Sequence, residues 1–250
     1  GLDDLRGWTM HGCIQDYVDV YLTQECMNTV QSTFPYLVDT KFVTGGGDVG
    51  TLRWHIIDAA KPFEVGRHRV PVTPLRVEHG FIGPQRHPFE CLGFRIDSMS
   101  YVSDCHAIPP ATLDLMAGSQ LVVLDALNMY RHPSHFSIPQ AITTVLELST
   151  RAHPPALALF VDMAHRVEYH ATEEQLKELV TRLRAFRSSL SASVNNAWWS
   201  EAWDADENEA QAFLALRPDV RTMPESGPPC PEVPAMHLAV DRLRVLFSKP

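Results

Sequence analysis

The fold is decided by residues 101–136, which read YVSDCHAIPPATLDLMAGSQLVVLDALNMYRHPSHF. In this stretch a strand-like run, a polar loop, a short helix, an apolar run and a second polar loop follow one another. Pro109 and Pro110 suit the first turn of the helix, and Gly118 suits its end. The run Leu121–Leu124 is continuously apolar, which is typical of a parallel strand buried on both faces. The stretch therefore predicts an α/β fold.

The same kind of pattern extends outward in both directions. On the N-terminal side, short runs rich in β-branched residues predict strands at 17–22, 52–57, 63–65, 69–77, 92–96 and 99–103. On the C-terminal side, strands at 157–161 and 243–247 are expected, with helices at 140–148 and from 172 to about 187. Two helix starts are marked by capping residues, Thr23 and Ser137, and a third by the capping-box pattern that begins at Thr172.

Composition narrows the class of protein. The 250 residues suffice for one large domain, and 45% hydrophobic with 20% charged residues is ordinary for a globular protein. A net charge of −9 argues against nucleic acid or an anionic membrane as partner. The five cysteines have no paired spacing, which predicts reduced thiols and a cytoplasmic location. The expected partner is therefore a small molecule.

Four chemically active residues share a placement in the predicted fold. His79, Asp104, His135 and His165 each lie just beyond the C-terminal end of an expected strand. Because such ends meet along one edge of a layered α/β structure, these side chains could form one site. Imidazole and carboxylate together suit zinc, manganese or iron. The alternative is that they are separate loop residues, since the chain contains twelve histidines.

Several short motifs, taken in order, resemble those of a known family. They are GLDDLR at 1–6, PFEVG at 62–66, VEHG at 77–80, GFRI at 93–96, YVSDC at 101–105, IPP at 108–110, LVVLDAL at 121–127 and HPSHF at 132–136. The series is similar to that of the metallo-β-lactamase superfamily, in the branch that contains the phosphoribosyl cyclic phosphodiesterase. The resemblance covers about residues 1–180 and the closing strand.

The resemblance implies a fold and a metal centre. The fold would be a metallo-β-lactamase-like αββα sandwich with two divalent metal ions, zinc or manganese, at one edge. By position, His79 and His165 would be metal ligands, and Asp104 would bridge the metals. His135 would contact the substrate phosphate or protonate the leaving group. Asp162 remains an alternative ligand to His165.

One part of the family pattern is absent from this chain. In the family a His-x-His-x-Asp-His motif lies immediately before Gly-Leu-Asp-Asp-Leu-Arg, and this sequence begins at that glycine. We therefore expect a domain that is incomplete at its N-terminus, a fragment that holds metal weakly or not at all and is inactive by itself. The expected domain comprises residues 1–187, an insertion at 188–234 that contains a tryptophan cluster, and a closing strand within 235–250.

The sequence leaves three functions open. The first is a metal-dependent phosphodiesterase in which a metal-bridging hydroxide attacks phosphorus, with Asp104 and His135 as the catalytic residues. The second is a non-catalytic family member that acts as a binding or scaffold protein. The third is a thioester or lactone hydrolase with the same centre. No membrane attachment is expected, and a homodimer is expected from related enzymes.

Overall fold

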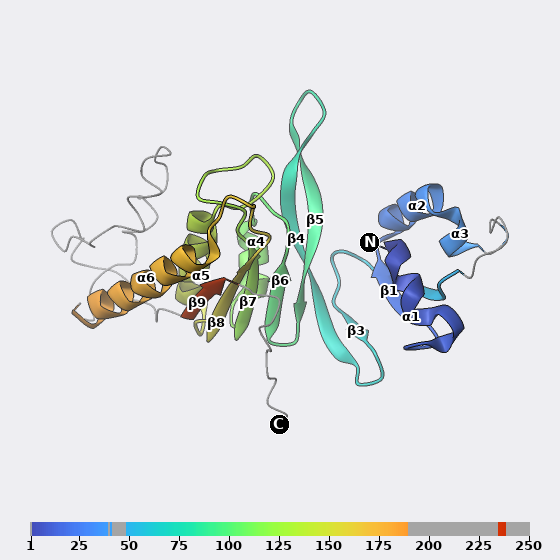
Figure 1. Ribbon diagram of the computed structural model, residues 1–250, viewed down its shortest axis with the longest axis horizontal. Coiled ribbons are helices and arrows are strands. Elements are labelled where there is room, and N and C mark those ends of the chain that lie inside the picture. The colour runs from blue at the N-terminus through green and yellow to red at the C-terminus, as the bar shows by residue number, and fades with distance from the viewer. Residues whose placement is uncertain (1, 40, 42–48, 190–234, 239–250) are drawn as a thin grey trace. The chain divides into compact units, whose positions relative to one another are not determined.

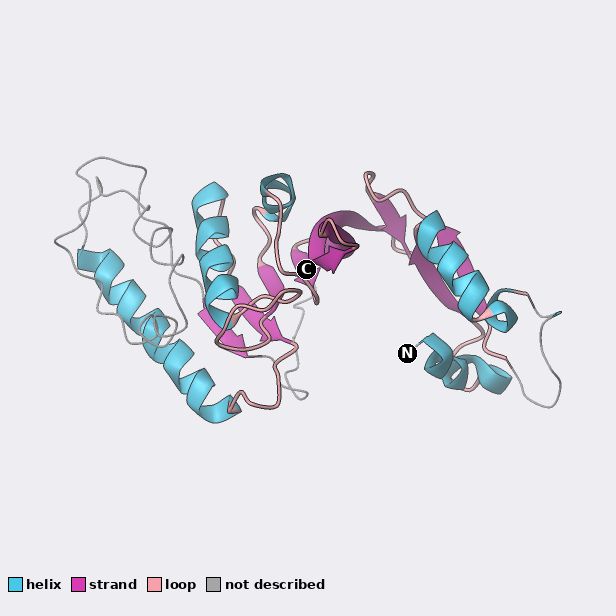
Figure 2. Cartoon of the chain, turned by 90° about the horizontal axis from the view of Figure 1, so that it is seen from above, coloured by secondary structure: helices cyan, strands magenta, loops and turns pink. Residues whose placement is uncertain are grey.

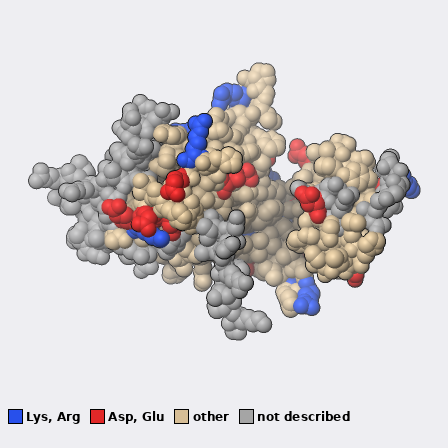
Figure 3. Space-filling model, viewed as in Figure 1, with Lys and Arg blue, Asp and Glu red and all other residues tan. Residues whose placement is uncertain are grey.

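The computed structural model describes residues 2–39, 41, 49–189 and 235–238 (Figure 1). Contacts divide the chain into two compact units, residues 1–63 and 64–250, which are described separately. On the face seen in Figure 3, acidic and basic side chains are interspersed. None of the helices that the structure describes is both long enough and apolar enough to span a bilayer.

The first unit is small and contains a two-stranded parallel sheet. Its strands are β1 (Val18–Leu22) and β2 (Leu52–Ile56), and its helical elements are two 3-10 turns (Leu2–Leu5, Met10–Gly12), α1 (Arg6–Thr9), α2 (Gln24–Thr33) and α3 (Pro35–Val38). The predicted cap of α2 is confirmed, because the Thr23 hydroxyl accepts a hydrogen bond from the Cys26 amide at 3.2 Å.

The second unit is built on a seven-stranded sheet in which the strands lie in sequence order, β3 to β9. Strand bounds are β3 (Phe63–Val65), β4 (Val70–Ile82), β5 (His87–Ile96), β6 (Met99–Val102), β7 (Leu121–Asp125), β8 (Leu157–Val161) and β9 (Ala235–Leu238). The β4–β5 and β5–β6 pairs are antiparallel, whereas β6 to β9 pair in parallel. The mixed α/β class predicted from residues 101–136 is therefore confirmed.

The helices among the described residues of this unit lie beside its strands (Figure 2). They are α4 (Pro110–Met116), α5 (Ile138–Arg151) and α6 (Tyr169–Ser189). Helix α5 begins with a complete capping box, in which the Ser137 hydroxyl accepts from the Gln140 amide and the Gln140 side chain accepts from the Ser137 amide. Its apolar side packs against the strands, with Ile142 and Leu146 fully buried next to Leu124 of β7. This core fixes the ends of β6, β7 and β8, from which the candidate site is built.

Two elements differ from the sequence prediction. The sequence predicts strands at 69–77 and 92–96, but the antiparallel pairing of β4 with β5 continues up to Ile82 and His87, so the two strands form a longer hairpin. Helix α6 begins at Tyr169 rather than after Thr172, since the Glu168 carboxylate accepts hydrogen bonds from the amides of His170 and Ala171. Thr172 is instead buried inside the helix.

The predicted domain bounds are only partly covered by the described residues. The expected insertion 188–234 and the expected closing strand 243–247 lie almost entirely outside them. Strand β9 at Ala235–Leu238 extends the sheet by pairing in parallel with β8. The division into 1–187, 188–234 and 235–250 stays a prediction.

Candidate metal centre

The position of His79 is set by a bulge near the end of β4. The pairing of β4 with β5 shifts register between Glu78 and Phe81, and His79 lies in this irregular part. Its Nδ1 lies 2.7 Å from the carbonyl oxygen of Ser134. Because a carbonyl can only accept, Nδ1 carries the proton, and Nε2 keeps its lone pair available for a metal.

Asp104 reaches the same place from the loop that follows β6. The loop is attached to β4 by a bridge between Glu78 and Ala107 and by the His106 amide, which donates to the Glu78 carbonyl at 2.7 Å. The Ser103 hydroxyl donates to Asp104 Oδ2 at 2.6 Å. These bonds hold the Asp104 carboxylate beside His79 although the two residues lie on strands that are not neighbours.

His135 is positioned by Asp125, the last residue of β7. Asp125 is fully buried, and its Oδ2 lies 2.8 Å from His135 Nδ1. The same oxygen accepts from the amides of Cys105 (3.0 Å) and Phe136 (3.3 Å). Burial raises the pKa of Asp125 to about 6, while the bonds from Cys105 and His135 act in the opposite direction. The ionised carboxylate fixes the His135 tautomer with the proton on Nδ1 and the lone pair on Nε2.

Three of the four residues singled out from the sequence are brought together. Ligand-capable atoms of His79, Asp104 and His135 all lie within 4.8 Å of one another. The two imidazole rings meet edge to face, with centroids 4.9 Å apart. Two imidazoles and one carboxylate suit a divalent metal of the zinc or manganese type, and each imidazole has a partner that fixes its tautomer. The donor set therefore fits the metal that the resemblance implies.

His165 lies apart from this group. It is exposed in the turn Ala164–Val167 after β8 and belongs to neither candidate ligand group found among the described residues. The alternative residue, Asp162, does belong to one, with Asp125 and His135, and its Oδ2 lies 3.7 Å from His135 Nδ1. Asp162 also has φ +63°, a backbone conformation rare outside glycine and often found at functional positions. Which of the two binds metal stays a prediction.

Two further residues of the site were not identified from the sequence. Asp125 ends a buried apolar strand, and a carboxylate in that position is a signal that could have been read. His106 accepts a hydrogen bond from the Gly80 amide at 2.9 Å through Nδ1, and its Nε2 lies 3.8 Å from Glu78. It supports the backbone next to His79.

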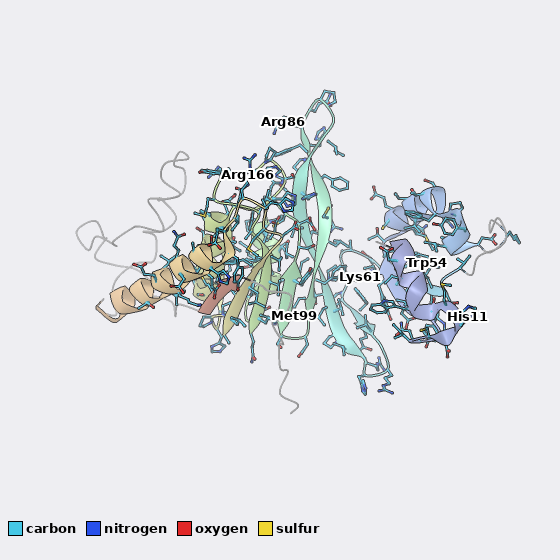
Figure 4. The ribbon with its side chains drawn as sticks, in the orientation of Figure 1. His11, Trp54, Lys61, Arg86, Met99 and Arg166 are labelled. Carbon is cyan, nitrogen blue, oxygen red and sulfur yellow. The ribbon has the colours of Figure 1, made fainter. Side chains whose placement is uncertain are left out.

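A pocket of about 520 Å³ opens beside His79 on the β4–β5 hairpin. It is lined by His79, Gly80, Phe81, Ile82, Gly83, Arg86, Phe89, Pro133 and Ser134. Figure 4 labels Arg86 near the tip of this hairpin. Since His79 and Ser134 belong to both, the pocket is continuous with the candidate metal centre.

Comparisons with known proteins agree with the fold. One similar solved structure is a diphosphatase of the PhnP family, with 21% identity and a TM-score of 0.55; the match covers 70% of this chain and 59% of the other. This chain thus spans about three fifths of that structure. Zinc-bound PqqB from Methylobacterium extorquens (13% identity, TM-score 0.42, 58% and 54% covered) and unliganded yeast PDE1 (11%, 0.43, 62% and 51%) are more distant.

No curated protein matches the chain. The model of the β-lactamase superfamily domain matches residues 1–160. That match covers more than half of the sequence and includes the motifs that carry His79, Asp104 and His135. The chain therefore belongs to the β-lactamase superfamily, as the resemblance to the metallo-β-lactamases predicted.

Proposed function

We propose that this protein is a metal-dependent hydrolase that cleaves a phosphodiester of a small molecule. The observation that carries the proposal is the convergence of His79, Asp104 and His135 within 4.8 Å, at the edge of a pocket of substrate size. Similarity in fold to a PhnP-family diphosphatase supports phosphoryl chemistry. The sequence motifs similar to the phosphodiesterase branch support it independently.

His79 and Asp104 are the proposed ligands in this chain. His79 presents Nε2, because Nδ1 is bonded to the Ser134 carbonyl, and Asp104 is oriented by Ser103. A divalent cation bound there would supply a Lewis acid that activates water and offsets charge on the phosphoryl group. His165 is the further ligand implied by the resemblance, and Asp162 is the alternative that lies next to His135.

His135 is the proposed general acid. Its Nδ1 is held by the Asp125 carboxylate, so the ring can carry a second proton on Nε2 with the resulting charge stabilised by Asp125. During hydrolysis the oxygen of water bonds to phosphorus and gives up one proton to the solvent, the bond from phosphorus to the leaving oxygen breaks, and His135 transfers its Nε2 proton to that oxygen and regains one from the solvent. The location in the cytoplasm and the homodimer expected from the sequence remain predictions.

The test combines metal content with hydrolysis. The full-length gene product would be purified without chelator, its metal measured by elemental mass spectrometry, and bis(p-nitrophenyl) phosphate offered as substrate. His79→Ala and Asp104→Asn should lower both metal content and hydrolysis, whereas His135→Ala should lower hydrolysis and leave metal bound. His153→Ala, an exposed histidine outside both ligand groups, is the matched control.

Three outcomes would count against the proposal. Unchanged metal content in His79→Ala and Asp104→Asn would show that the ligand assignment is wrong. Bound metal with no cleavage of the phosphodiester, but with cleavage of a thioester or lactone, would change the substrate class. A protein that binds no metal and hydrolyses none of these esters would be the non-catalytic family member.

A further inference from the structure

The β4–β5 hairpin carries an unusual set of side chains along the pocket. Phe81, Ile82 and Phe89 are 40%, 54% and 44% exposed. Such large apolar side chains gathered on one projecting hairpin are typical of a binding surface, because each leaves apolar area in contact with water. The hairpin backbone is paired on both sides of the irregularity between Glu78 and Phe81, so the two strands together form a wall of the pocket.

Arg86 adds a positive charge to this wall. Its guanidinium carbon lies 4.6 Å from the centre of the Phe81 ring, in cation–π contact. Within the part of the chain that the structure describes, Arg86 forms no ion pair, and no Asp or Glu lines the pocket. In a chain of net charge −9, the pocket is thus locally cationic and suits an anionic ligand.

The close approach of two backbones joins the pocket to the metal centre. Gly80 has φ +73°, and a Cβ built on it would lie 3.1 Å from the Ser134 Cβ. The absence of a side chain at Gly80 lets the hairpin lie directly against the loop that carries Ser134 and His135. A ligand with its phosphoryl group at His79 would therefore have its organic part between Phe89, Ile82 and Arg86.

From these observations we propose that the pocket selects phosphoesters whose organic group is a planar aromatic ring, held by Phe89 and by Arg86, which lies over the Phe81 ring. This inference rests on the proposed function for the position of the phosphoryl group. An aromatic ring in the ligand can stack on the planar phenyl and guanidinium groups of the pocket. A flexible alkyl chain cannot make this contact. A 520 Å³ pocket has room for a ring of one or two cycles.

The test measures binding and does not depend on turnover. Phenylphosphonate and methylphosphonate, which cannot be hydrolysed as esters, would be titrated into the full chain by calorimetry, with zinc present and after chelation. Phenylphosphonate should bind about tenfold more tightly. Phe89→Ala should remove this preference, and Arg86→Gln should weaken phenylphosphonate binding several-fold.

Matched controls separate the pocket from general effects. Tyr101→Ala removes an equally exposed aromatic side chain from β6, and Arg67→Gln removes an exposed guanidinium at the opposite end of β4; neither residue lines the pocket. Both should keep the wild-type preference. Phe89→Leu, which preserves apolar volume but not the ring, should lose most of the preference while its thermal unfolding remains that of the wild type.

The outcomes distinguish this inference from the proposed function. Equal affinity for the two phosphonates, or a preference that survives Phe89→Ala, would overturn the inference even if the protein hydrolyses bis(p-nitrophenyl) phosphate. A preference for the phenyl compound without any hydrolysis would support the aromatic pocket and count against the proposed activity. If Phe89→Ala left phosphonate binding intact and turned a dimer into a monomer in sedimentation, the hairpin would be a contact between copies and the inference wrong.

Discussion

The buried Asp125 carboxylate and the partly buried His135 imidazole form a pair, with Asp125 Oδ2 2.8 Å from His135 Nδ1. The other carboxylate oxygen, Oδ1, is buried and has no hydrogen-bond partner among the described residues. Burying a carboxylate without partners lowers the stability of the fold. The hydrogen bonds from His135 and from the amides of Cys105 and Phe136 offset this loss at Asp125. The pair links the sheet core to the candidate site.

Replacing Asp125 by Asn should therefore change the chemistry of His135 more than it changes the stability of the fold. The Asn side-chain oxygen would take the place of Oδ2, because the amides of Cys105 and Phe136 donate there, so it keeps accepting from His135 Nδ1 while the negative charge that stabilises a doubly protonated ring is lost. We expect hydrolysis to fall by about 10- to 100-fold, with metal content retained. Nuclear magnetic resonance of the His135 ring nitrogens would report the tautomer directly. The tautomer should be unchanged in the variant, and unchanged activity would show that the charge of Asp125 does not support the proposed role of His135.

Either Asp162 or His165 is expected to bind the metal in addition to His79 and Asp104, and variants of the two residues should distinguish these alternatives. If Asp162 contributes, Asp162→Ala should lower metal affinity by about 10-fold or more, and His165→Ala should have no effect. If His165 contributes, as the family pattern implies, the turn Ala164–Val167 must bring its exposed ring inward when metal binds. Metal titration of the two single variants, monitored by competition with a chromogenic chelator, decides between them.

Much of the site could be predicted from the sequence because it follows from strand order. Asp104 and His135 lie after adjacent parallel strands, so their convergence needs only the predicted sheet. The position of His165 could not be predicted from strand order. The direction of the loop after β8 depends on the left-handed conformation of Asp162, which no local sequence pattern encodes. Similarly, the length of the β4–β5 hairpin follows from pairing between two distant runs rather than from either run alone.

Gly80 should be more sensitive to substitution than another glycine with similar backbone geometry. Gly80 and Gly118 both have positive φ, +73° and +79°, so alanine costs about 1–2 kcal/mol at either position through backbone strain. Only at Gly80 would the new Cβ meet another residue, the Cβ of Ser134 at 3.1 Å. Chemical unfolding should show a greater loss in the free energy of unfolding for Gly80→Ala than for Gly118→Ala. Metal affinity should fall only in Gly80→Ala. Equal losses would mean that the Ser134 loop moves aside freely.

The cysteines should differ sharply in reactivity. Burial raises the pKa of the Cys105 thiol, and the nearby Asp125 and Asp104 carboxylates raise it further. Cys13 and Cys26 are exposed. Alkylation of the native protein with iodoacetamide at neutral pH, followed by peptide mass spectrometry, should modify Cys13 and Cys26 and spare Cys105. Early modification of Cys105 would mean that the loop between β6 and α4 opens in solution.

The start of α6 provides a prediction about pH. The amides of Ala171 and His170 donate to the Glu168 carboxylate at 2.6 and 3.2 Å, and these bonds lower its pKa below the ordinary 4.5. A carboxyl group with a lowered pKa in the folded state adds stability above its unfolded pKa and loses that contribution as the pH falls through the folded value. Glu168→Gln should therefore lower the melting temperature at neutral pH, and the difference should vanish well below pH 4.5. Glu174→Gln, an exposed glutamate in the same helix, should show no comparable pH dependence. A Glu168→Gln effect that persists in acid would mean that the side chain stabilises the helix by packing and not through its charge.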